Sequence, residues 1–203
     1  MAVLTAGAAA QAAWFSHRVH LALKLECAAC HPAALNSTRA DDDLLPKREV
    51  CLKCHQTAAA GAPPDRAETP RLARFSHQQH LKPGNVAPVI AAAIDHKTYL
   101  TPPAAGLRAQ LNTTNPCAAC HRGLEVSDRP DHNALPQMAD CLVCHSRIEP
   151  PDSCELCHLN SAALKPANHT PDFLDTHTTG KLGLDETTCA VCHGRHFRCL
   201  GCH

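Results

Sequence analysis

The segment Phe15-Ser16-His17-Arg18-Val19-His20-Leu21 stands ahead of the pentapeptide Cys27-Ala28-Ala29-Cys30-His31. Both parts recur, because Phe75-Ser76-His77-Gln78-Gln79-His80-Leu81 stands ahead of Cys117-Ala118-Ala119-Cys120-His121. In each copy a Leu-Pro pair and a second Cys-x-x-Cys-His follow. A duplication of this kind indicates one structural unit used twice. The unit combines two upstream histidines with two cysteine motifs.

All 14 cysteines belong to Cys-x-x-Cys-His pentapeptides, and there are seven of these motifs. Such a motif attaches a c-type haem: two thiols bond one porphyrin and the adjacent imidazole binds its iron. We therefore predict seven covalently bound haem c groups. Motifs 1 to 7, in chain order, are Cys27/Cys30/His31, Cys51/Cys54/His55, Cys117/Cys120/His121, Cys141/Cys144/His145, Cys154/Cys157/His158, Cys189/Cys192/His193 and Cys199/Cys202/His203.

Three other classes of site contain paired cysteines. Structural disulfides suit a small exported protein, but they do not explain a histidine after every second cysteine. Zinc sites need four ligands, and an odd number of cysteine pairs cannot all combine two by two into four-cysteine sites. A thioredoxin-like redox motif occurs once, at the start of a helix. Haem attachment explains both the spacing and the number of motifs.

The composition indicates that the protein interior is not built from side chains alone. Only 3% of the 203 residues are aromatic, so few large side chains are present to form a core. Dividing 203 residues by seven motifs leaves about 29 residues for each haem. Even a fully extended chain keeps Cys192 of motif 6 and Cys199 of motif 7 within roughly 25 Å of each other, so neighbouring haems must lie close together. We predict a mostly irregular chain with short α-helices and little or no β-sheet, a multihaem cytochrome c fold organised around seven closely packed haems.

Nine histidines lie outside the motifs, and seven irons need a ligand on their second face. Only two methionines are present, so these distal ligands are predicted to be imidazoles, which implies low reduction potentials. On short helices capped by Ser16 and Ser76, histidines three residues apart project from one face toward two neighbouring haems. The reserve candidates are His96 and His196. The predicted distal ligands are His17, His20, His77, His80, His132, His169 and His177.

The order of the motifs divides the chain into segments. Residues 1–13 form an apolar N-terminal segment that is similar to the end of a signal peptide. Residues 58–74, which contain Pro63-Pro64, are predicted to be a linker. The haem-carrying parts are diheme module 1 at 14–57, diheme module 2 at 75–147 with an insertion at about 91–115, and a triheme C-terminal region at 148–203.

The sequence resembles the multihaem c-type cytochromes, and within them the class III type, whose members carry Phe-x-His-x-x-His ahead of the first motif. The matching residues are Phe15, His17 and His20 with motif 1, and the corresponding three residues with motif 3. The resemblance implies that His17 binds the Cys27 haem and that His77 binds the Cys117 haem. The segment from Asn168 to Phe173, followed by His177, is similar to distal-ligand segments of larger relatives.

These features predict electron transfer along a row of bis-histidine haems. The 19 basic and 19 acidic residues cancel, which leaves no basic face for nucleic acid, and no apolar run reaches the roughly 18 residues of a transmembrane span. Each ferric haem with ionised propionates adds about −1, so seven give a holoprotein charge near −7. Redox proteins with basic patches are the expected partners. Because haem is attached outside the cytoplasmic membrane, we expect an exported protein, periplasmic or extracellular.

Two other functions are compatible with the same motifs. The chain could be a subunit of a polymerising cytochrome filament, with copies of itself as partners, or a haem subunit of a membrane respiratory complex. The last residue, His203, is a predicted proximal ligand and would place one haem at the edge of the chain. A multihaem reductase would instead leave one iron open, with Tyr99 as the single tyrosine for a crosslink. Because all seven motifs end in histidine and distal candidates exceed the need, no enzyme is predicted.

Overall fold

The computed structural model describes residues 15–56, 72, 74–129, 134–145, 154–160, 164–176 and 186–194. These residues form short helices joined by loops, and none of them is in a β-strand, which confirms the predicted fold class. The predicted N-terminal segment, and the predicted linker apart from residues 72 and 74, lie outside the described residues. The α-helices are α1 (His17–Leu21), α2 (Cys27–Cys30), α3 (Arg48–Cys51), α4 (His77–Leu81), α5 (Ala87–Asp95), α6 (Leu107–Gln110), α7 (Met138–Leu142), α8 (Phe173–Thr176) and α9 (Glu186–His193). The 3-10 helices are η1 (Pro32–Leu35), η2 (Cys117–Ala119), η3 (Leu124–Val126) and η5 (Cys154–Leu156).

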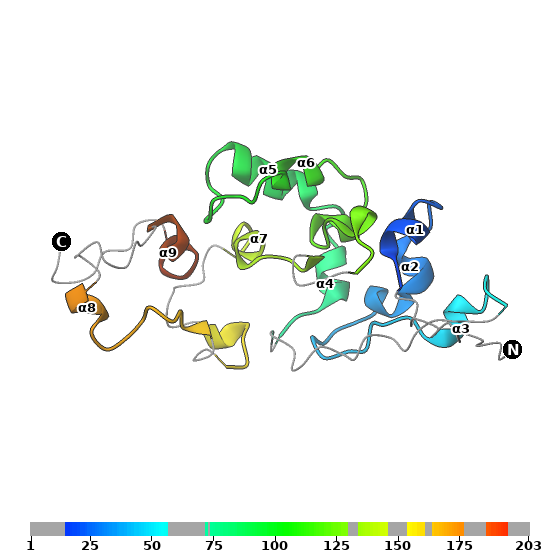
Figure 1. Cartoon of the computed structure of the whole chain (residues 1–203), viewed down its shortest axis with the longest axis horizontal. Helices are drawn as coiled ribbons and strands as arrows, with labels where there is room; N and C mark the ends of the chain where they lie inside the picture. Colours follow the sequence, from blue (N-terminus) through cyan, green and yellow to red (C-terminus); the bar gives the residue numbers. More distant parts are fainter. Residues whose placement is uncertain are drawn as a thin grey trace, which may run out of the picture.

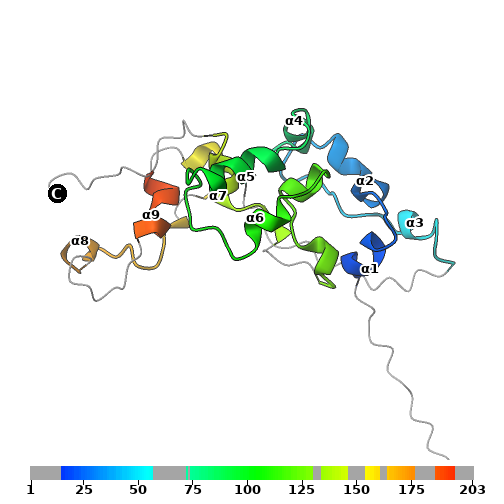
Figure 2. The same cartoon turned by 90° about the horizontal axis from the view of Figure 1, so that it is seen from above.

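The helices follow one another along the longest axis of the molecule. Figure 1 shows α1, α2 and α3 at one end, α4 to α7 in the middle, and α8 and α9 toward the other end. The view from above keeps this order (Figure 2). The cysteine motifs are therefore distributed along the axis instead of around one centre.

Two short helices carry the upstream histidine pairs, and serines cap both of them as predicted. The Ser16 hydroxyl accepts a hydrogen bond from the backbone N–H of Val19 at 3.2 Å. In the same way the Ser76 hydroxyl accepts from the N–H of Gln79 at 3.2 Å. Each cap satisfies one of the backbone donors that a helix start leaves without an internal partner.

The two modules hold each other's histidine helices. The Arg18 N–H in α1 donates to the Ser127 carbonyl at 3.0 Å, and the Gln78 N–H in α4 donates to the Ser37 carbonyl at 3.0 Å. Arg18 and Gln78 each follow the first histidine of their helix, and Ser37 and Ser127 each lie six residues after a motif histidine. The equivalence of donors and acceptors gives the two modules a reciprocal, pseudo-two-fold relation.

On one side of this junction a side-chain clamp adds to the backbone contact. The Arg18 guanidinium bonds both carboxylate oxygens of Asp128, with the nearest contact at 2.9 Å, and the Ser16 hydroxyl donates to the same carboxylate. On the other side the Ser76 hydroxyl donates to the Ser37 carbonyl at 3.2 Å. The docking is the same in both modules, but only the first copy uses a charge pair for it.

The buried apolar core is small, rich in alanine and centred on module 2. Helix α5 supplies four of its nine residues, with Tyr99 and Leu107 from the loop and helix that follow. Large apolar side chains in module 1 remain exposed, including Leu23 at 68% and Val19 at 51%. The complete cluster is Ala87, Ile90, Ala91, Ala93, Tyr99, Leu107, Leu111, Ala119 and Ala139. Side chains alone therefore bury little apolar surface in module 1.

A buried polar cluster joins the insertion to motifs 3 and 4. The Asp140 carboxylate accepts from the Tyr99 hydroxyl at 3.0 Å, from Arg122 Nη2 at 2.5 Å and from the Gln137 N–H at 2.7 Å. Arg122 Nη1 also donates to the Ala119 carbonyl at 2.7 Å. The side chains of Arg122 and Asp140 are 4% and 2% exposed. Because Arg122 follows His121 and Asp140 precedes Cys141, the ion pair fixes the two motifs relative to each other.

Candidate haem-iron sites

Five pairs of imidazole rings face each other, each pair joining a predicted distal ligand to a motif histidine. The ring centroids are 6.1 to 6.3 Å apart in all five. Two nearly parallel pairs and two tilted pairs come from the duplicated modules, and the fifth comes from the C-terminal region. The pairs are His17–His31, His20–His55, His77–His121, His80–His145 and His169–His193, with interplanar angles of 8°, 58°, 13°, 43° and 8°.

This separation is too long for ring-to-ring contact and has the length of a nitrogen–metal–nitrogen bridge. Metal–imidazole bonds of about 2.0 Å, together with about 1.1 Å from each nitrogen to its ring centroid, give centroids about 6.2 Å apart. Among the described residues, no group of three or more His, Cys, Asp or Glu side chains gathers as a bare metal ion requires. The residues therefore fit an iron that receives its four equatorial ligands from a porphyrin.

Hydrogen bonds at Nδ1 orient several of these rings. His20 and His80 place Nδ1 2.8 Å from the carbonyl oxygen of the N-cap serine four residues upstream. In the motif histidines His31 and His121, Nδ1 lies 2.8 and 3.0 Å from a carbonyl thirteen residues downstream. His169 places Nδ1 2.9 Å from the side-chain oxygen of its neighbour Asn168. A bonded Nδ1 directs Nε2 toward the facing ring, as metal-ligating histidines require.

Phenylalanine packing completes each histidine helix. Phe15 stacks on His20 with centroids 4.4 Å apart and meets His17 edge-on at 4.9 Å. Phe75 repeats this arrangement with His80 at 4.4 Å and His77 at 4.8 Å. The conformation of the Phe-x-His-x-x-His segment is thus reproduced in both copies. One aromatic ring fixes the two imidazoles that point to different motifs.

Burial keeps three of the paired imidazoles neutral. It lowers the pKa of His17 and of His77 below 6.5, with the facing motif histidine as the second cause. Burial also lowers the pKa of His121, to which His31 adds a further downward contribution. Only a neutral imidazole has the lone pair that binds a metal. These groups therefore remain in their ligating form at lower pH than an exposed histidine.

Five thiols, Cys30, Cys117, Cys120, Cys141 and Cys192, have a pKa raised first by burial and also by a thiol of another motif nearby. Burial and its neighbours raise the pKa of Cys141 to about 11. Motifs 1, 3, 4 and 5 thereby each have two identified neighbours, and motifs 2 and 6 each have one. The interacting pairs are Cys30–Cys51, Cys27–Cys117, Cys120–Cys144, Cys141–Cys157 and Cys154–Cys192. The motifs therefore follow the spatial order 2, 1, 3, 4, 5, 6.

Cys54, a predicted haem-attachment residue, is exposed, as are Cys141 and Cys144 of motif 4. A thiol that binds a closely packed haem is expected to be enclosed, as the four half-buried cysteines of motifs 1 and 3 are. Leu52 and Lys53 beside Cys54 are exposed as well, so the second motif of each module lies near the surface. Cys54 still lies close enough to Cys30 to contribute to the raised pKa of that thiol. Attachment of haem at Cys54 therefore stays a prediction, for a site at the surface of module 1.

Not every predicted ligand can be compared with the structure. His96 ends α5 as an exposed C-cap residue and faces no motif histidine among the described residues. The described part of motif 5 includes Cys154, Cys157 and His158. The predicted residues that lie outside the described part are His132, His177, His196, Cys199, Cys202 and His203.

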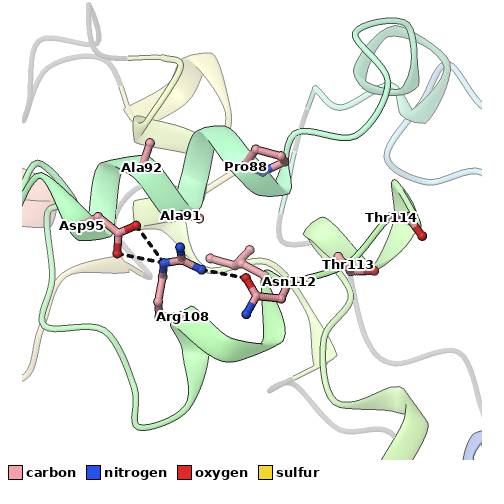
Figure 3. Close-up of a pocket in the computed structure, with 9 residues that line it drawn as sticks. Pro88, Ala91, Ala92, Asp95, Arg108, Asn112, Thr113 and Thr114 are labelled. Carbon is pink, nitrogen blue, oxygen red and sulfur yellow. Dashed lines mark hydrogen bonds and ion pairs between the residues drawn. The ribbon is translucent and has the colours of Figure 1, made fainter.

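Two hollows adjoin module 2, and no cysteine or histidine of a motif lines either of them. One cavity of about 630 Å³ lies beside Tyr99, Arg122 and Val191. The other, of about 420 Å³, lies between α5 and α6 (Figure 3). In it Arg108 bonds the Asp95 carboxylate at 2.8 Å and the Asn112 side chain at 2.9 Å. The charges at this second hollow cancel, so it offers no directed site for a charged ligand.

Residues 13–71 match a family model described as cytochrome c7 and related cytochrome c. This similarity supports a multihaem c-type cytochrome. It indicates electron transport with covalently bound haem. The matched segment contains module 1 and most of the predicted linker. No characterised protein and no solved structure matched the chain in the other two comparisons. Among the described residues, no helix is long and apolar enough to cross a membrane.

The buried Arg122–Asp140–Tyr99 cluster and the crossed docking of the modules were not predicted from the sequence. A signal for the cluster exists in the comparison of the two copies. Arg122 follows motif 3 where Pro32 follows motif 1, and Asp140 precedes motif 4 where Val50 precedes motif 2. A complementary charge pair that appears together in one copy is consistent with contact between those positions.

Proposed function

We propose that the protein transfers electrons through seven haem c groups, each bound between two histidines. When bound, each haem supplies a one-electron Fe(III)/Fe(II) couple. The observation that carries the proposal is the repeated separation of 6.1 to 6.3 Å between facing imidazoles. An isolated histidine pair at this distance has little meaning. Five pairs, each joining a motif histidine to a histidine upstream of it, support bis-histidine ligation throughout the chain.

For five irons the facing rings identify the proposed ligand pairs. His17 and His77 serve motifs 1 and 3, in agreement with the resemblance to class III cytochromes. His20 and His80 serve the second motif of their own module, and His169 serves motif 6. For motifs 5 and 7 we retain His132 and His177 as the proposed distal ligands, with the assignment between the two motifs left to experiment.

The positions of the thiols support a continuous route. Motif 2 is at one end of the order, motifs 1 and 3 meet between the modules, and motifs 4, 5 and 6 continue toward the C-terminal region. The route thus departs from chain order at one place, where it passes from motif 2 back to motif 1. Redox proteins that dock at the two ends are the proposed donor and acceptor. Because c-type haem is attached outside the cytoplasmic membrane, we propose a periplasmic or extracellular location.

The mass of the mature holoprotein provides the first test. We expect the polypeptide mass plus seven haem increments, and six increments for a Cys27→Ala/Cys30→Ala variant. Ferric spectra should be low-spin, and most midpoint potentials should lie below zero on the hydrogen scale. Fewer than seven increments, or a fully reduced protein in which carbon monoxide binds a substantial fraction of one haem, would contradict the proposal.

A further inference from the structure

The ligand pairs of the two modules lie in two different environments. At motifs 1 and 3 the motif histidines, His31 and His121, are half-buried, and so are the upstream histidines that face them. At motifs 2 and 4 the motif histidines, His55 and His145, are exposed. A ferric bis-imidazole site carries one more positive charge than a ferrous site, and burial disfavours the more charged form. Burial therefore favours the reduced state at motifs 1 and 3.

Hydrogen bonding to the upstream histidines also differs between the two kinds of site. His17 and His77 each have a buried Nδ1 with no hydrogen-bond partner among the described residues. His20 and His80, in contrast, have a carbonyl oxygen 2.8 Å from Nδ1. A hydrogen bond from Nδ1 makes a ligating imidazole more basic, which stabilises the ferric iron. The first histidine of each helix lacks this bond and the second has it, but the motif histidines His31 and His121 have Nδ1 2.8 and 3.0 Å from a carbonyl oxygen. Each of the four sites thus has one bonded Nδ1, and burial carries the difference between them.

A hydrogen bond to a cysteine sulfur affects motif 1 alone. Asn115 Nδ2 in module 2 donates to Cys27 Sγ in module 1 at 3.3 Å, while Asn115 Oδ1 accepts from the Cys117 N–H at 2.9 Å. The sulfur of Cys27 becomes a thioether when haem is attached, and a thioether remains a weak acceptor. A donor at this sulfur withdraws electron density from the porphyrin, which also favours the reduced state. Motif 1 has Leu25 at the position that corresponds to Asn115.

Given the proposed function, we infer that the sites of motifs 1 and 3 have the two highest potentials of the four sites in the modules. These two sites meet at the junction, where Cys27 and Cys117 lie together. Mutual repulsion between added charges separates the two potentials, and we infer that this separation is smaller than the difference that burial makes. Electrons that enter from either module reside first at the junction. The junction is therefore a two-electron store between the ends of the route.

A redox titration of the wild-type holoprotein, followed by haem-methyl NMR signals, tests the order of reduction. Each signal is assigned through contacts with the ligand histidines. We expect the sites of His17/His31 and His77/His121 to pass half-reduction before those of His20/His55 and His80/His145. The reverse order would overturn the inference and would indicate that the tilted rings at motifs 2 and 4 control the potentials. Missing haem at these motifs would instead refute the proposed function.

Asn115→Ser isolates the contact with the thioether, because a serine hydroxyl still accepts from the Cys117 N–H but does not reach Cys27. We expect the ratio of reduced to oxidised haem at motif 1 to fall about two- to fivefold at a fixed solution potential. The ratio at motif 4 should not change. Asn112→Ala, in the same segment, is the matched control and should leave motif 1 unchanged. An unchanged ratio in Asn115→Ser would exclude the Asn115 contribution. In reduced wild-type protein, lack of a nuclear Overhauser contact between the Asn115 amide and the Cys27 thioether would exclude it as well.

Discussion

Replacement of Asp140 by alanine should strongly destabilise module 2. The substitution leaves the Arg122 guanidinium, with its side chain 4% exposed, as a buried charge without its carboxylate partner. It also removes the acceptor for the Tyr99 hydroxyl and the Gln137 N–H. Breaking one partner of a buried pair costs about 3–5 kcal/mol. At about 4 kcal/mol the ratio of folded to unfolded protein falls roughly a thousandfold.

Guanidinium chloride unfolding of the holoprotein, followed by far-ultraviolet circular dichroism, measures this loss. The exposed pair Asp95–Arg108 at the hollow in Figure 3 supplies the control, and Asp95→Ala should leave the midpoint within experimental error. A double variant, Arg122→Met with Asp140→Leu, should recover most of the loss because it removes both buried charges. A loss below about 1 kcal/mol in Asp140→Ala would refute the interpretation that the pair is buried in the holoprotein.

Three further outcomes are expected. Burial, then the Asp140 charge, raises the pKa of Tyr99 above 10.0. The contribution of the protonated Tyr99 hydroxyl to the free energy of unfolding is therefore complete below pH 10 and is lost as pH rises further. Tyr99→Phe should abolish this alkaline loss of stability, measured by unfolding between pH 8 and 11. Ser76→Ala removes the cap on the Gln79 N–H and should cost about 1 kcal/mol in a denaturant titration, with Ser76→Thr as the conservative control. His20→Gly should open one iron, so the reduced variant should bind one carbon monoxide per molecule; binding no greater than in wild type would contradict the assignment of His20 as a ligand.

The local structure of the histidine helices could be predicted from the sequence because it depends on near neighbours. Ser16 and Ser76 act as caps in a four-residue context, and the spacing of His17 and His20 sets which face of the helix they share. The close spacing of the cysteine motifs likewise predicted a mostly irregular chain with short helices and little or no sheet. Both inferences use information contained within a few residues or in the spacing of the motifs. They did not require the tertiary arrangement.

The contacts between modules could not be predicted in the same way. The acceptor for Arg18 N–H is the Ser127 carbonyl, more than a hundred positions away, and any residue type supplies a backbone carbonyl. No side-chain pattern therefore marks this contact. The buried pair Arg122–Asp140 does involve specific side chains, but a single charged residue in one sequence is most often a surface residue. Only its position against the core formed by the insertion shows that it is buried.

The two modules have kept their ligand geometry and diverged in what surrounds it. Ring separations in module 2 repeat those in module 1, at 6.3 Å for the first histidine and 6.1 Å for the second. The insertion, the buried ion pair and the contact of Val191 with the core are specific to module 2. Helix α9, which carries Val191 between two motif cysteines, packs on α7, which carries the first cysteine of motif 4. The extra residues of the second copy therefore act on the connection between module 2 and the C-terminal region, while the arrangement of the facing histidines is the same in both copies.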